Sequence, residues 1–107
     1  MDKLAQSRAV VRAALAEKVD MLARELPRLT PIRVAYAVDD IRREARGYRL
    51  DTLAALASGL EREMASSPNV AVVLPYLEAM GDALECEELS PAVQAALLAS
   101  VGLRLHG

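Results

Sequence analysis

The sequence contains no phenylalanine or tryptophan, only 2 isoleucines and 3 tyrosines. Strands of β-sandwiches and barrels are rich in β-branched and aromatic side chains, so this scarcity argues against an all-β fold. Alanine (20 residues) and leucine (17 residues) dominate instead, and both are strong helix formers. Hydrophobic residues make up 53% of the chain, which excludes intrinsic disorder. We expect a single all-α domain over residues 1–107.

Several function classes are disfavoured by further absences. Cys86 is the single cysteine and His106 the single histidine, so the sequence offers neither an internal disulfide nor a zinc site. It also has no glycine-rich phosphate loop, and Cys86 lies among glutamates. We therefore expect no enzyme, no metal and no cofactor. Acid–base catalysis would need Asp39, Asp40 or Glu44, and we expect these helix-surface acids to be solvated rather than catalytic.

The charge balance and hydropathy also limit the partners. The 13 basic and 15 acidic residues give a net charge of −2, which disfavours binding to nucleic acid or to an anionic membrane surface. No apolar run approaches the ~20 residues of a membrane span. The amphipathic stretch after Met1 argues against a secretory signal. We expect a soluble, cytoplasmic protein.

Prolines, glycines and capping residues divide the chain into five expected helices. Gly47 is expected just past the end of the second helix, Asp51 is expected to cap the third, and Pro75 is expected to kink the fourth helix or delay its start. Short connections between these helices predict an up-and-down antiparallel four-helix bundle with an additional helix. The expected helices run from about Asp2 to Leu26, Pro31 to Arg46, Asp51 to the turn at 67–69, Val70 to Glu85, and from Ser90 onward.

Apolar residues recur at helical spacing and define the expected core. The stripe of the first helix comprises Leu4, Val11, Leu15, Val19, Leu22 and Leu26. That of the second comprises Val34, Val38, Ile41, Ala45 and Tyr48. That of the third comprises Leu53, Leu56, Ala57, Leu60 and Met64.

The second helix carries an unusual combination of residues on the side opposite its core stripe. At 100° per residue, this side holds two apolar side chains beside an aspartate and three arginines, one of them on the flank. One interpretation is that the arginines are merely solvated and that Asp39 pairs with Arg42 or Arg43. An apolar centre surrounded by arginines is also the composition of a protein-binding surface. The candidate partner-binding residues are Ile32, Tyr36, Asp39, Arg42, Arg43 and Arg46.

This segment resembles the histidine-containing phosphotransfer domains of bacterial phosphorelays. The resemblance lies in the run from Ala37 to Ala45, in the aromatic Tyr48 before a turn, and in the apolar run from Leu53 to Ala57. Ile41 matches the hydrophobic position of the family motif and Arg42 its basic position. The resemblance implies a leading helix and a four-helix bundle, with a receiver domain or a histidine kinase as the partner.

The centre of the motif departs from the family pattern. The phosphoacceptor histidine of the family falls on Asp39, and the small glycine falls on Arg43. A neutral imidazole is a good nucleophile for phosphoryl transfer, whereas a carboxylate repels the incoming group. The resemblance therefore implies a domain that binds its partner without accepting a phosphoryl group.

An alternative belongs to another class, a helical interaction or dimerisation module unrelated to phosphorelays. The expected fifth helix carries more apolar residues than one narrow stripe can bury, which would suit a homodimer. These residues are Leu97, Leu98, Val101, Leu103 and Leu105.

Overall fold

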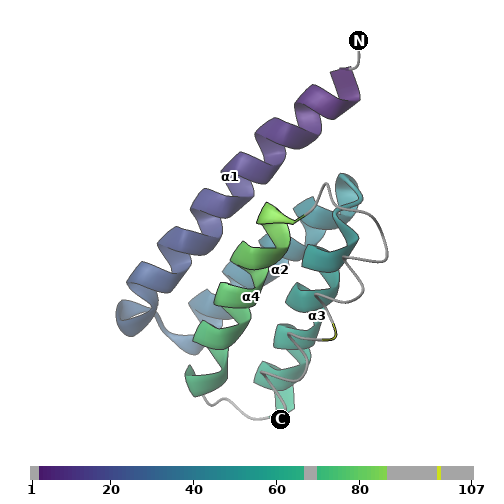
Figure 1. Cartoon of the computed structure of the whole chain (residues 1–107). Helices are drawn as coiled ribbons and strands as arrows, with labels where there is room; N and C mark the ends of the chain where they lie inside the picture. Colours follow the sequence, from purple (N-terminus) through teal and green to yellow (C-terminus); the bar gives the residue numbers. More distant parts are fainter. Residues whose placement is uncertain (1–2, 67–69, 87–98, 100–107) are drawn as a thin grey trace.

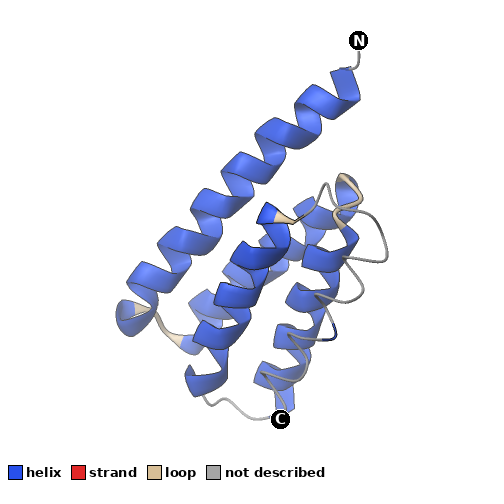
Figure 2. Cartoon of the chain, in the orientation of Figure 1, coloured by secondary structure: helices blue, strands red, loops and turns tan. Residues whose placement is uncertain are grey.

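A computed structural model describes residues 3–66, 70–86 and 99, and every regular element within these residues is helical (Figure 2). The chain forms α1 (Lys3–Glu25), a short 3₁₀ helix at Leu26–Arg28, α2 (Pro31–Gly47) and α3 (Asp51–Ser66). A second 3₁₀ helix, Val70–Val72, leads into α4 (Val73–Glu85). The all-α fold class is confirmed.

Consecutive helices run in opposite directions (Figure 1). The closest neighbours are α2 with α3 and α1 with α4, and α3 also packs against α4. α1 is the longest helix, at 23 residues, and its N-terminal end projects past the other three (Figure 1). A four-helix, up-and-down arrangement therefore holds for the described residues. The expected fifth helix lies outside them, apart from Ala99.

The apolar stripes meet between the helices and form one core, as expected. Val34, Val38, Ile41 and Ala45 of α2 are at most 1% exposed. Leucines and alanines of α3 and the apolar side of α4 complete this core with Leu15, Val19 and Leu22 of α1. Tyr48, Met64, Val11 and Leu26 are partly buried at its edges, and the side chain of Leu4 lies outside the described residues.

The end of α2 differs from the expectation for Gly47. This glycine is the last residue of α2 and has no positive φ, whereas Arg49 has a φ of +57°. The Leu50 N–H donates to the Ala45 carbonyl (2.8 Å) and the Arg49 N–H donates to the Arg46 carbonyl (3.2 Å). This is the Schellman pattern, with Arg49 as the left-handed residue. It brings Leu50 back into the core, where its side chain is fully buried.

The next two helix starts also depend on local chemistry. α3 begins at Asp51 itself, and the Leu50 carbonyl accepts the first helical hydrogen bond, from the Ala54 N–H (3.0 Å). Asp51 thus lies in the first turn, where its charge complements the helix dipole, rather than at the cap position expected for it. The late start of α4 is confirmed. Pro75 is the third residue of α4, where a missing N–H removes no helical hydrogen bond.

Candidate functional site

Two apolar side chains on the outer side of α2 are open to solvent. The side chains of Ile32 and Tyr36 lie one helical turn apart and are 62% and 69% exposed, respectively. Thr30 starts this helix by accepting a hydrogen bond from the Arg33 N–H, and Pro31 occupies the first helical position. The start of α2 is therefore well defined, and it presents an apolar centre beside the arginines that follow.

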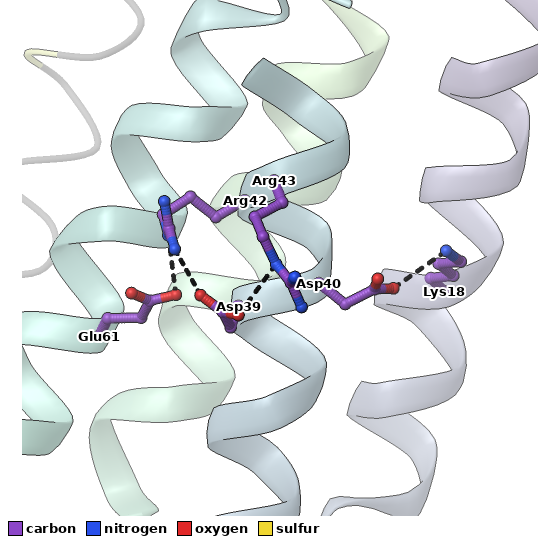
Figure 3. Close-up of polar contacts among 6 residues, drawn as sticks. All are labelled: Lys18, Asp39, Asp40, Arg42, Arg43 and Glu61. Carbon is purple, nitrogen blue, oxygen red and sulfur yellow. Dashed lines mark hydrogen bonds and ion pairs between the residues drawn. The ribbon is translucent and has the colours of Figure 1, made fainter. Parts of the chain in front are cut away.

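Asp39, the next residue of interest along this face, is surrounded by guanidinium groups (Figure 3). One carboxylate oxygen accepts a hydrogen bond from Arg42, and the other pairs with the Arg43 Nε at 3.0 Å. Both ion pairs predicted for Asp39 are present together. The Asp39 side chain is consequently only 35% exposed, less open than a residue on the outer face was expected to be.

Arg42 joins α2 to α3. In addition to Asp39, its guanidinium group contacts Glu61 of α3, with an Nε–Oε1 distance of 3.1 Å (Figure 3). The Arg42 side chain is 20% exposed, so this predicted partner-binding residue is largely engaged within the domain. Arg43 remains open to solvent while it pairs with Asp39, and Arg46 is also exposed.

The electrostatic effect on Asp39 follows from these contacts. The hydrogen bond from Arg42 is the largest influence and lowers the pKa of Asp39 below its usual value. Desolvation, the next largest influence, opposes this shift, and the nearby charges of Arg43 and Arg42 add to it. Asp39 is thus held in its charged form. Its negative charge is balanced by adjacent guanidinium groups.

The other acidic residues near Asp39 also have basic partners. Lys18 of α1 donates to Asp40 (3.1 Å) and to Glu44 (2.9 Å), two acids on the α1 side of α2. These hydrogen bonds, with that to Glu44 the larger influence, raise the pKa of Lys18. Charged contacts therefore run across three helices, from α1 through α2 to α3.

A shallow groove lies between α2 and α3 beside this network. It has a volume of about 310 Å³ and is lined by Arg42, Arg46, Ser58, Glu61, Arg62 and Ala65. We call it the α2–α3 groove. Sequence reasoning singled out Arg42 and Arg46 but missed the α3 residues, because the register of α2 against α3 cannot be read from spacing within either helix.

Two other findings concern the described part of the chain. No group of three or more histidine, cysteine, aspartate or glutamate side chains there could hold a metal ion. Among the same residues, no helix combines the length and apolar character needed to cross a membrane. Cys86 is a free cysteine at the end of α4, and His106 lies outside the described residues.

The chain was compared with protein-family models, with curated proteins and with solved structures, and none of the three comparisons gave a match.

Proposed function

We propose that this protein is a phosphotransfer-like signalling domain that binds a receiver domain or a histidine kinase through α2 and does not itself accept a phosphoryl group. The observation that carries this proposal is the exposed pair Ile32 and Tyr36 beside Arg43 and Arg46. Tyrosine and arginine are enriched among the residues that dominate binding energy at protein interfaces. The sequence resemblance places the functional position of the family on this same helix.

The surroundings of Asp39 support the second half of the proposal. A carboxylate that already pairs with two guanidinium groups is a poor nucleophile, because attack on a phosphoryl group would have to break both interactions. The neighbouring acids Asp40 and Glu61 are likewise bound to Lys18 and Arg42. Asp39 would therefore contribute to the charge pattern of the binding face rather than to group transfer.

The test measures binding and phosphoryl transfer in the same samples. The protein is mixed with a panel of receiver domains and histidine kinases from its own source, with calorimetry for binding and labelled ATP for transfer. We expect binding without label on this protein. In the double variant Ile32→Ala/Tyr36→Ala, we expect the affinity for the partner to fall about 30-fold or more. This corresponds to a loss of ~2 kcal/mol of binding free energy, the size of effect seen when a dominant interface residue is truncated.

The matched control is Val10→Ala, which truncates a similarly exposed apolar side chain (68%) on α1. We expect it to bind like the wild type, and circular dichroism checks that all variants remain helical. Equal binding by the double variant and the wild type, or no binding across the panel, would reject the proposed function. Label on this protein would reject the claim that it cannot accept a phosphoryl group.

A second candidate, self-association as a helical module, is favoured by one observation. Val10 and Met21 are both exposed apolar residues on α1, and their separation of 11 residues places them on the same side of that helix. Sedimentation at rising protein concentration tests it. A dimer that Val10→Asp/Met21→Asp dissociates would support this candidate, and a monomer throughout would reject it.

A further inference from the structure

The α2–α3 groove brings basic residues of two helices together. Arg42 and Arg46 are four residues apart on α2, and Ser58, Arg62 and Ala65 follow at helical spacing on α3. Residues three or four apart lie along the same side of a helix. The groove is therefore bordered by one row of side chains from each helix, with arginines in both rows.

The charges around the groove do not cancel. Arg42 and Arg43 are bound to Asp39 and Glu61, so these two cations are balanced by two anions. Arg46 and Arg62 also line the groove. Neither of these two arginines forms an ion pair within residues 3–66 and 70–86. The groove consequently keeps two positive charges without partners among the residues that the structure describes.

We propose that the α2–α3 groove binds the phosphoryl group of a phosphorylated protein side chain. Such a group carries a charge of about −1.5 to −2 at neutral pH and three strong acceptor oxygens. Guanidinium groups pair well with phosphate, so Arg46 and Arg62 supply the matching charge, and the Ser58 hydroxyl supplies a further donor. A carboxylate offers one charge and two oxygens and matches this arrangement less well.

The inference deepens the proposed function and rests on it for the carrier of the group, a phosphorylated side chain of the bound protein. Arg42 and Arg46 belong both to the groove and to the face of α2 proposed for partner binding. A phosphorylated side chain that enters the groove would therefore lie beside the proposed protein contact. The phosphoryl group is bound there, and no bond to it forms or breaks.

The test is a titration of the full chain with phosphoserine, a stable phosphate ester that serves as the probe for the phosphoryl group. The titration is monitored by NMR of backbone amides and arginine Nε–H groups at constant ionic strength. We expect saturable shifts at Ser58, Arg62 and Arg46. Arg46→Gln and Arg62→Gln should each weaken binding about fivefold, the upper range for one exposed ion pair, and the double variant should show no saturation. Arg33→Gln, which changes an exposed arginine of α2 outside the groove, should bind like the wild type.

Four further comparisons test the proposal. Serine should not bind, and acetate should bind more weakly than phosphoserine. Affinity should fall between about pH 7.5 and about pH 5, because the ester gains a proton with a pKa near 6. A peptide with phosphoserine between alanines should bind more tightly than phosphoserine itself if a protein carries the group. Weaker binding by the peptide would overturn the choice of carrier.

Absence of saturable phosphoserine binding by the wild type, or equal losses in Arg33→Gln and the groove variants, would overturn the phosphoryl site. Neither result would affect partner binding through Ile32 and Tyr36, which the calorimetry measures separately. Conversely, phosphoserine binding that depends on Arg46 and Arg62, without a partner in the panel, would establish the groove and reject the proposed function. The two proposals can therefore fail independently.

Discussion

At the scale of single residues, Arg42 has a contact pattern that differs from that of an ordinary surface arginine. It donates to Asp39 on its own helix and to Glu61 on the next, while most of its side chain is covered. Arginine suits this position because its planar guanidinium group presents donors in several directions, whereas a lysine ammonium group carries its charge at a single point. The contact links the charged face of α2 to α3.

The paired state of Asp39 has a defined pH dependence. Its pKa is lowered in the folded protein, so its stabilising contribution is complete above the usual aspartate pKa of about 4 and is lost as the pH falls through the lower, folded-state value. We expect Asp39→Asn to lower the midpoint of thermal unfolding at neutral pH. This difference from the wild type should shrink as the pH falls below about 4.

Circular dichroism melts at several pH values measure this difference. Asp20→Asn is the control, because Asp20 pairs with Arg24 in a solvent-exposed i,i+4 contact of 3.3 Å. We expect it to have little effect at any pH. An Asp39→Asn difference that does not change with pH would contradict the assigned role of the Asp39 carboxylate.

Two glycines within helices offer a comparison of packing with backbone entropy. A Cβ atom at Gly81 of α4 would meet no atom within 4 Å, so Gly81→Ala should stabilise the protein by about 0.5–1 kcal/mol. At Gly59 of α3, a Cβ atom would lie 3.3 Å from the ring and the hydroxyl oxygen of buried Tyr76. Urea denaturation should show a smaller gain, or a loss, for Gly59→Ala. A larger gain at Gly59 than at Gly81 would contradict this account.

At the scale of elements, the link between α2 and α3 depends on one left-handed residue. Arg49 adopts a φ of +57° that glycine takes without steric penalty, and its carbonyl accepts a hydrogen bond from Arg8 of α1 (3.5 Å). Arg49→Gly should therefore stabilise the protein by up to about 1 kcal/mol, since relief of the left-handed conformation, about 1–2 kcal/mol, outweighs the additional backbone entropy that glycine loses on folding, about 0.5–1 kcal/mol. The backbone acceptor for Arg8 is kept.

Chemical denaturation checks this expectation, with Arg46→Gly as the matched control. Arg46 lies in the last turn of α2 with helical geometry, so glycine there should destabilise the protein by about 0.5–1 kcal/mol. If Arg49→Gly also destabilised the protein, the Arg49 side chain would contribute more stability than its left-handed backbone conformation costs.

The helices themselves were largely predictable from the sequence, because burial follows the periodicity of apolar residues. Val34, Val38, Ile41 and Ala45 were assigned to the core from their spacing alone, and all are buried. The end of α2 was not predicted correctly. The expectation relied on the general preference for glycine as the left-handed residue that follows a helix. In this chain Leu50 is buried, and the left-handed residue before it is Arg49 instead.

At the scale of the whole molecule, the candidate site combines predictable and unpredictable parts. Exposure of Ile32 and Tyr36, and the pairs of Asp39, follow from positions within one helix. The contact from Arg42 to Glu61 and the α2–α3 groove depend on how far one helix is shifted along its neighbour. That shift is set by packing of the whole bundle, so the residues contributed by α3 could not be assigned from sequence.

The three-residue connection between α2 and α3 has a consequence for the order in which this chain folds. The two helices are close in sequence and pack directly on each other, so the loop that must close between them is short and loses little entropy. Pairing of α1 with α4 requires closure of a much longer loop. During synthesis, α2 and α3 can therefore form a hairpin before α4 is made, and the main contact of α1, with α4, forms last.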